Sequence, residues 1–537
     1  MKSLFGLLLV ALIGLSVAQA QTYTYDAAGR LSAVTHTNGQ VFYYHHDRAG
    51  NLLSVDTDLV SPVALPATLN ARIGGRVDLD ITGRNPMGAH VYKVTGLPAG
   101  LTINPATGRI TGQVTAKPGT YTIRYSAQAG KKTSPVQTLQ LVVTGFPAAL
   151  VGGYDALLVD ANELPVGRVS IDVAATGTYT GKLLHLDGRD YTLKGNLTVP
   201  ADGKTASAMA TVKRAASLSV LTVAFTVSES GALTVDLRDN NLPSAVAKEG
   251  LRRAVFTKAS PAAWAGLYTL TLPATTYRSD APQGASYASV TIAGTGVLSL
   301  KGKTAEGKLL TGSLPPSTSR VYQAYLRPNV GAGSYLALVL KLNPIVTGST
   351  TYSATPAGGS DGIWTKFASP KDKTYPQGFA PLALDPRLLR WTPPAKSQTL
   401  NAALGLPTSG EFGVRIQGNG LDGTRSGTRN IYGLPAHLAM STSGKMTKAE
   451  NVPVNFTGTL TPATGVVVGS FEITDTTTVG TKVTILKRKV PFEGIWEQGS
   501  AGDIGAGYFL LPPVDKTGLT RAGLIDFTLT APRPKNP

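Results

Sequence analysis

Residues 94–127 read VTGLPAGLTINPATGRITGQVTAKPGTYTIRYSA and form the centre of a run of short strands and turns. The segment 96–101, GLPAGL, forces a turn and inserts apolar residues into a core. Residues 104–108, NPATG, form a tight β-turn ahead of another short strand. The strand that follows places three side chains on one face: Tyr121, Ile123 and Tyr125. The pattern predicts a compact β-sandwich over residues 58–147.

This stretch resembles the bacterial putative Ig domain, a cadherin-like, dystroglycan-type sandwich, over about residues 60–146. The resemblance implies a spacer or adhesion module of a surface protein. Many members carry an Asp-rich calcium loop just before this stretch, whereas segment 81–88 has only Asp78 and Asp80 upstream of it. Because a calcium site needs several converging oxygens, we expect no calcium ion here.

Residues 21–57 contain two copies of the pattern aromatic-Asp-x-x-Gly-x-Leu, at 25–31 and 46–52. Each copy predicts a β-hairpin corner in which Asp initiates the turn, Gly takes a positive φ, and the flanking Tyr and Leu pack on the sheet. The copies resemble the YD (Rhs) repeat. Many copies wind into a large β shell in that family, for which carbohydrate binding has been suggested. Two copies are too few to enclose a cargo.

The first twenty residues predict a signal peptide and therefore an exported protein. Lys2 provides a positive start, residues 4–17 are apolar, and 18–20 read AQA, a small-residue cleavage site. The chain has no cysteine, which excludes a lipoprotein anchor, disulfides and thiolate metal sites. No later segment is apolar for long enough to predict a transmembrane helix. We expect a secreted location or one at the cell surface or outer envelope.

The formal charge of +18 favours polysaccharide or another anionic envelope component as a partner. The densest basic clusters are only Lys131-Lys132, Arg252-Arg253 and Lys487-Arg488-Lys489. None is interleaved with aromatic residues, so specific nucleic-acid binding is not expected. The pattern leaves the oligomeric state open.

From residue 152 onward, the predicted strands share one pattern, in which apolar and polar residues alternate. This part of the chain also contains an internal repeat, because the sequence of residues 256–261 recurs in similar form at 364–370, after an offset of 108 positions. The predicted fold class is all-β and multi-domain: an Ig-like β-sandwich followed by two or three divergent antiparallel β-barrel or sandwich units. The predicted units are 150–262, 263–372 and 373–530, with a disordered tail at 531–537.

Two glycine motifs fit catalytic or cofactor patterns but lack the required context. Residues 358–362, GGSDG, fit G-x-S-x-G, yet the loop leads straight into Trp364 and not into a helix. Residues 418–423, GNGLDG, fit G-x-G-x-x-G, but no amphipathic helix follows, which favours a glycine-rich hairpin loop. We assign no catalytic residue and no cofactor.

One local cluster has metal-ligand chemistry, at His45, His46 and Asp47. Adjacent strand residues point to opposite faces, so only His45 and Asp47 could share an ion. Because a metal site needs three or four ligands, a cross-strand or exposed pair is the favoured interpretation and no metal is assigned.

Aromatic residues near the ends of β segments offer a sugar-stacking hypothesis: Trp264, Tyr268, Trp364, Trp391 and Trp496. The favoured alternative is that these side chains fill the cores of their units.

The sequence therefore predicts a non-enzymatic exported surface or secreted protein that serves in adhesion or binding, with carbohydrate or another envelope component as the ligand. Two alternatives remain open. One is a secreted carbohydrate-active hydrolase with an unfamiliar β catalytic domain, whose paired carboxylates come from distant strands. The other is a structural protein of a self-assembling surface layer.

Overall fold

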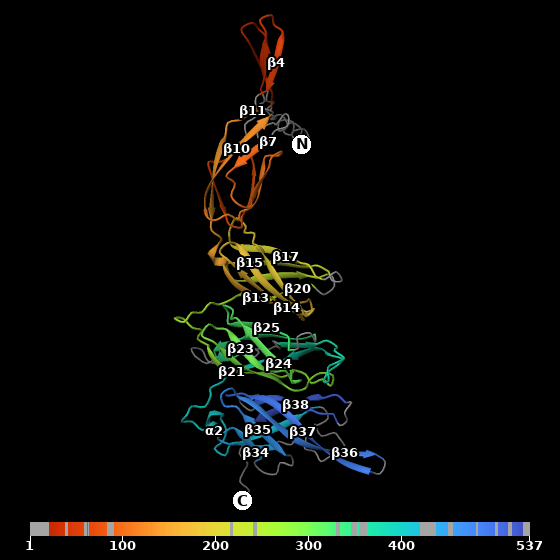
Figure 1. Ribbon diagram of the computed structural model, residues 1–537. Helices are drawn as coiled ribbons and strands as arrows, with labels where there is room; N and C mark the ends of the chain where they lie inside the picture. Colours follow the sequence, from red (N-terminus) through yellow and green to blue (C-terminus); the bar gives the residue numbers. More distant parts are fainter. Residues whose placement is uncertain are drawn as a thin grey trace, which may run out of the picture. The chain divides into compact units, whose positions relative to one another are not determined.

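The computed structural model is almost entirely β-structured, as predicted (Figure 1). It describes residues 21–37, 41–57, 62, 64–82, 91–129, 132–214, 219–239, 244–328, 333–344, 352–353, 362–418, 436–448, 455–479, 482–499, 503–513 and 518–529. The chain divides into two compact units. Unit 1 comprises Met1–Val151, Ala174–Thr178 and Asn196–Ser207, and unit 2 comprises Gly152–Val173, Tyr179–Gly195 and Ala208–Pro537.

The first strands of unit 1 form a four-stranded antiparallel sheet in the order β1-β2-β3-β4. Its strands are β1 (Thr22–Tyr25), β2 (Leu31–Thr35), β3 (Val41–His46) and β4 (Leu52–Thr57). The Asp26 carboxylate accepts the backbone N–H groups of Ala28 and Arg30, both at 2.9 Å, and Asp47 accepts that of Asn51 at 2.8 Å. The glycines of the two copies have φ values of 78° and 94°. The two predicted hairpin corners are confirmed.

One detail of that prediction is wrong. Tyr25 and Leu52 were expected to pack on the sheet, but they are 59% and 52% exposed. The reason is that these four strands form a single layer, in which a side chain has no opposing sheet to pack against.

The second part of unit 1 is a two-sheet sandwich. One sheet has the order β11-β10-β12-β5, with β7 also paired to β10, and the other has the order β6-β9-β8. Ile123 and Tyr125 are buried and Tyr121 is half-buried, so the predicted face of this strand points into the core. The strands are β5 (Thr68–Arg72), β6 (Arg76–Asp80), β7 (Val91–Thr95), β8 (Leu101–Asn104), β9 (Arg109–Gln113), β10 (Gly119–Ala129), β11 (Lys132–Thr133) and β12 (Gln137–Thr144). A 3-10 helix, η1 (Ala148–Leu150), follows.

An eight-stranded antiparallel sheet comes next, in the order β16-β15-β14-β13-β20-β19-β18-β17. Its strands keep the predicted alternation, with Leu221, Val223, Phe225 and Val227 all buried in β18. The strands are β13 (Gly152–Val159), β14 (Pro165–Val173), β15 (Thr178–His185), β16 (Asp190–Asn196), β17 (Thr205–Val212), β18 (Leu221–Ser228), β19 (Leu233–Arg238) and β20 (Ala245–Arg252).

We expect His185, at the end of β15, to make the stability of this sheet depend on pH. Its side chain is fully buried, and its Nδ1 accepts the backbone N–H of Asp187 at 3.4 Å. Burial lowers the pKa of His185, although Asp187 and Asp239 oppose the shift. The unfolded chain therefore binds a proton at His185 more tightly than the folded chain does. The stability that neutral His185 contributes is complete above about pH 6.5 and is lost as the pH falls through the folded pKa.

We expect the melting temperature to fall between about pH 7 and pH 5, with a shallower fall in His185→Gln, as scanning calorimetry across this range can measure. His45→Gln, at an exposed position in β3, controls for the loss of one histidine. An equal pH slope in wild type and His185→Gln would assign the dependence to another group.

Two sheets of unit 2 share one hydrophobic core. The first has the order β24-β23-β22-β21-β31 and the second the order β25-β26-β29-β30. Tyr268 and Leu300 of the first sheet and Leu338 and Trp364 of the second belong to the same buried cluster. The strands are β21 (Gly266–Leu272), β22 (Ser286–Ile292), β23 (Leu298–Lys303), β24 (Leu309–Leu314), β25 (Val321–Leu326), β26 (Ser334–Lys341), β29 (Gly362–Lys366), β30 (Phe379–Leu384) and β31 (Arg387–Arg390), with a two-stranded ribbon of β27 (Asn343–Pro344) and β28 (Tyr352–Ser353).

The last eight strands close into a barrel, because β32 pairs with both β33 and β39. Phenylalanines and Trp496 fill its interior, so the barrel is a packed core. A single-turn helix, α2 (Leu400–Ala403), precedes it. The strands are β32 (Glu411–Gln417), β33 (Ala436–Met440), β34 (Lys445–Lys448), β35 (Phe456–Leu460), β36 (Val466–Val479), β37 (Lys482–Trp496), β38 (Asp503–Leu511) and β39 (Arg521–Thr528). The fold class is therefore confirmed, and the domain boundaries given above stay predictions.

Candidate functional site

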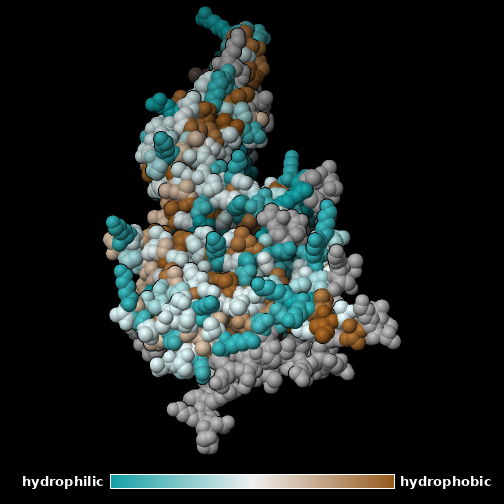
Figure 2. Space-filling model, turned by 60° about the horizontal axis from the view of Figure 1, so that its bottom comes forward, coloured by the Kyte–Doolittle hydropathy of each residue, from teal (hydrophilic) through white to brown (hydrophobic). Residues whose placement is uncertain are grey.

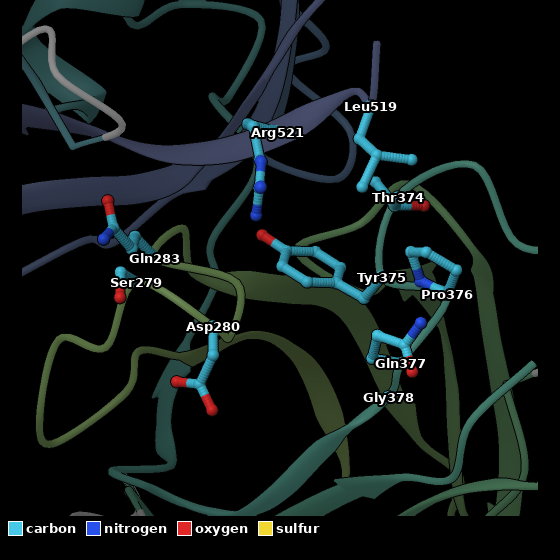
Figure 3. Close-up of a pocket in the computed structure, with 10 residues that line it drawn as sticks. All are labelled: Ser279, Asp280, Gln283, Thr374, Tyr375, Pro376, Gln377, Gly378, Leu519 and Arg521. Atoms are coloured by element: carbon cyan, nitrogen blue, oxygen red, sulfur yellow. The ribbon is translucent and has the colours of Figure 1, made fainter. Parts of the chain in front are cut away.

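Three segments of unit 2 line an open hollow of about 660 Å³ (Figure 3). The segments are the loop between β21 and β22, the loop between β29 and β30, and the chain around the start of β39. Small-molecule sites have volumes of about 300–1,000 Å³, so the hollow has the size of a ligand site. Its polar lining residues are Ser279, Asp280, Gln283, Thr374, Gln377 and Arg521.

The loop between β29 and β30 is held by its own hydrogen bonds. Asp372 Oδ1 accepts the backbone N–H groups of Thr374 and Tyr375 at 2.8 and 2.9 Å. The N–H of Ser369 donates to the carbonyl of Pro376 at 2.8 Å, and that of Gly378 donates to the carbonyl of Tyr375 at 3.0 Å. An Asp followed by such donors forms an Asx turn, which explains why this segment is ordered without being a strand.

Tyr375 forms the floor of the hollow. The residue is only 4% exposed, and its ring lies edge-to-face on Phe379, with centroids 5.7 Å apart. Its hydroxyl accepts the backbone N–H of Ala522 at 3.4 Å. Burial raises the pKa of Tyr375 to about 12, so the phenol stays protonated at neutral pH and keeps a proton to donate.

The loop between β21 and β22 contributes an ionised carboxylate. Arg278 contacts Asp280 through two nitrogens, at 2.5 and 3.0 Å. The hydrogen bond from Arg278 holds the pKa of Asp280 below its usual value. Gln283 of the same loop donates its backbone N–H to the carbonyl of Ala522 at 3.3 Å, which fixes the loop against β39.

Arg521 supplies the positive charge at the start of β39. Figure 3 shows its side chain directed toward the hydroxyl of Tyr375. Within the described part of the chain, no carboxylate lies in ion-pair range of Arg521. The hollow therefore combines hydroxyl, amide, carboxylate and guanidinium groups, a set that can bind a polyhydroxylated or anionic molecule.

The described lining of the hollow differs from a glycoside hydrolase site in its acidic residues. Asp280 is the sole acidic residue among the described residues that line it. Retaining and inverting glycosidases usually place two carboxyl groups on either side of the scissile bond. Among the described lining residues, Asp280 therefore has no second carboxyl group beside it.

The histidine cluster predicted from sequence lies on β3 and the turn after it. His45 lies opposite Ser54 and His46 opposite Leu52 in the sheet. Asp47 is engaged as a turn residue, because its other carboxylate oxygen accepts the side-chain amide of Asn51 at 2.9 Å. Across the described ranges, no group of three or more His, Cys, Asp or Glu residues is arranged to hold a metal ion. In the sandwich, Asp78 pairs with Arg109 at 2.6 Å.

The two glycine motifs fall largely outside the described residues. Of residues 358–362, only Gly362 is described, as the first residue of β29. Of residues 418–423, only Gly418 is described, directly after β32.

The tryptophans are core residues, as favoured from the sequence. The exposed fractions of Trp264, Trp364, Trp391 and Trp496 are 7, 1, 2 and 0%. Three indole N–H groups have internal acceptors: Tyr322 Oη at 2.7 Å, Ser334 Oγ at 3.1 Å and the carbonyl of Pro462 at 3.1 Å. None of the four can serve as an open stacking platform for a sugar, and Tyr268 is equally buried.

The described face in Figure 2 is mostly polar or of intermediate hydropathy. Figure 2 shows hydrophilic residues over most of the face in view and hydrophobic residues in small separate groups. In the described part of the chain, no helix has the length and apolar character that crossing a membrane requires.

Two segments match known protein families. Residues 60–144 match the family described as Putative Ig domain, and residues 25–58 match the RHS repeat. Both resemblances predicted from the sequence are confirmed. Together with the all-β fold they indicate a β-rich protein of the cell-surface or secreted class. More particularly, the chain joins an RHS-repeat segment to an Ig-like domain, two families that are typically non-catalytic.

Similar solved structures are distant. A putative α-galactosidase of Bacteroides fragilis is 22% identical, with a TM-score of 0.14, and the match covers 16% of this chain and 18% of that chain. A putative α-galactosidase/melibiase of the same organism is 23% identical, with the same coverage and TM-score. Domains 4–9 of the surface layer protein SbsC are 10% identical, with a TM-score of 0.12 and coverage of 96% and 97%. The comparison with curated proteins found no match.

Proposed function

We propose that this chain is a non-enzymatic exported adhesion or binding protein, and that the hollow around Tyr375 binds carbohydrate bearing an acidic group. The observation that carries the proposal is the composition of the hollow, whose lining combines Arg521 with hydroxyl and amide side chains. A guanidinium binds a carboxylate through two parallel hydrogen bonds, and amides and hydroxyls suit sugar hydroxyl groups.

Two further features support this proposal. The formal charge of +18 attracts acidic polysaccharide and raises its concentration near the surface. The RHS-repeat and Ig-like segments are modules of surface proteins, so the rest of the chain would be presented to envelope or extracellular material.

A glycan array that carries both neutral and uronic-acid oligosaccharides tests the proposal with the full chain. We expect retention on acidic glycans and a loss of affinity of about tenfold in Arg521→Gln, the effect of one charge-assisted contact of about 1.4 kcal/mol. Arg238→Gln is the matched control, because it removes the same charge from an exposed strand residue of the eight-stranded sheet.

Two outcomes would overturn the proposal. The first is that no glycan retains the wild-type chain. The second is that Arg521→Gln and Arg238→Gln lower retention equally, which would show that net charge and not the hollow is responsible.

A further inference from the structure

A buried lysine lies between two carboxyl groups in the core behind the hollow. Lys366 is the last residue of β29, and the side chains of Lys366, Glu306 and Asp372 are 0, 1 and 5% exposed. Its Nζ contacts Oε2 of Glu306 and lies 2.9 Å from Oδ2 of Asp372. Lys308 lies 3.8 Å from the same Asp372 oxygen but is one-third exposed. A charged group so deeply buried costs several kcal/mol in lost hydration, which makes this cluster unusual.

Three separate parts of the fold hold these groups in place. Lys366 belongs to the sheet that contains β25, β26, β29 and β30. Glu306 lies in the tight turn between β23 and β24 of the other sheet, where the N–H of Thr304 donates to the carbonyl of Lys308 at 2.8 Å. Asp372 is fixed by the N–H groups of Thr374 and Tyr375. The amine and both carboxyl groups are therefore preorganised by backbone structure.

The surroundings shift the pKa values of the two carboxyl groups in opposite directions. Burial raises the pKa of Glu306, although Lys366 opposes the shift. Burial also disfavours ionised Asp372, but the N–H of Tyr375, the Lys366 ammonium and the N–H of Thr374 outweigh it and hold the pKa of Asp372 far below its usual value. These shifts favour the protonated form of Glu306 next to the amine and the ionised form of Asp372.

We propose that Lys366 and Glu306 condense to an amide, which cross-links the two sheets covalently. Asp372 takes a proton from the ammonium group, and the free amine attacks Cδ of Glu306. The N–C bond forms and the bond from Cδ to the hydroxyl oxygen breaks. That oxygen takes a second amine proton and leaves as water. The third proton remains on the amide nitrogen, and Asp372 passes the first one to solvent. No oxidant or other reactant is required.

The surroundings favour this product. Attack requires reacting atoms about 3–3.5 Å apart, and Nζ already contacts the carboxyl group. The amide is neutral, so its formation removes the buried ammonium charge. The two residues are 60 positions apart, and a cross-link over that distance restricts the unfolded chain as a disulfide does. A chain without cysteine cannot form a disulfide.

Intact-mass measurement of the purified full chain, followed by a tryptic map, tests the proposal. We expect the mass to be lower by one water molecule, and residues 304–308 to remain joined to residues 342–371, because trypsin does not cut after an acylated Lys366. The joined peptide is decisive, since an Asp-Gly pair such as Asp187-Gly188 can lose water as a succinimide without joining peptides. Wild-type protein in which trypsin cuts after Lys366 would overturn the proposal.

Two variants sharpen the test. Lys366→Arg keeps the charge but removes the nucleophilic amine, and we expect it to retain the water. Lys308→Arg is the matched control in the same cluster, and we expect it to lose the water as wild type does. A map in which residues 342–371 are joined to residues 372–373 would reject Glu306 as the acceptor. The wild-type mass decides the central claim even if a variant fails to fold.

Discussion

Replacement of Trp496 by alanine should lower the stability of the barrel by about 3–5 kcal/mol, the usual cost of deleting a buried aromatic side chain. The indole is fully buried between two phenylalanines. Its ring lies edge-to-face on Phe412, with centroids 5.3 Å apart, and parallel to Phe527 at 5.8 Å. Because β37 carries Trp496 and β39 carries Phe527, the cavity would loosen both strands.

Native-state hydrogen exchange of the β37 and β39 amides measures this loss within the barrel itself. Trp496→Phe is the matched control, and we expect it to cost less than Trp496→Ala, because a phenyl ring leaves a smaller cavity. Its indole N–H has no hydrogen-bond partner among the described residues, so phenylalanine removes no bond to them. Trp364→Phe should cost more, because it leaves the buried Ser334 hydroxyl without its donor. The reverse order of the two phenylalanine variants would contradict this account.

Gly100→Ala should destabilise the Ig-like sandwich by at least about 3 kcal/mol. Gly100 has φ +92°, a conformation that side chains rarely adopt. An alanine Cβ would lie 1.9 Å from the carbonyl oxygen of Gln113, a backbone atom that cannot rotate away. Gln113 is the last residue of β9, which pairs with β8. The alanine Cβ can therefore be accommodated only if β8 and β9 move apart, which opens the three-stranded sheet.

Hydrogen exchange of residues 101–113 in the full chain reports this effect. Gly145→Ala is the matched control, since no heavy atom lies within 4 Å of its Cβ position and its φ is not left-handed. We expect that control to change stability by less than about 0.5 kcal/mol. Equal protection in Gly100→Ala and Gly145→Ala would show that the turn at 96–101 is not under the constraint described.

Local pattern was enough to predict the strands and turns. The alternation of residues 221–227 gives a strand with one buried face, because side chains of a strand point alternately to opposite sides. The two Asp-x-x-Gly corners at 26–29 and 47–50 form as predicted, since a turn is stabilised by groups within four residues. The burial of Trp364 and Trp496 also follows from their repeated positions.

The local sequence pattern was not enough to predict which apolar side chains are exposed. Tyr25 and Leu52 carry the same signal as residues that pack, but whether an apolar side chain is covered depends on a second layer. A second layer, where there is one, comes from another part of the chain. The seven residues of one repeat therefore do not show whether their side chains are covered.

The opening stretch, 94–127, determined by itself that this chain contains an Ig-like sandwich, because turn geometry and strand alternation are properties of neighbouring residues. Only the tertiary structure decided which groups meet across the fold. Arg521 lies beside Tyr375, and Lys366 contacts Glu306, through strand pairings and turns that join segments far apart in sequence. Neither contact can be predicted from the neighbouring sequence, because the packing of the whole core decides which distant segments come together.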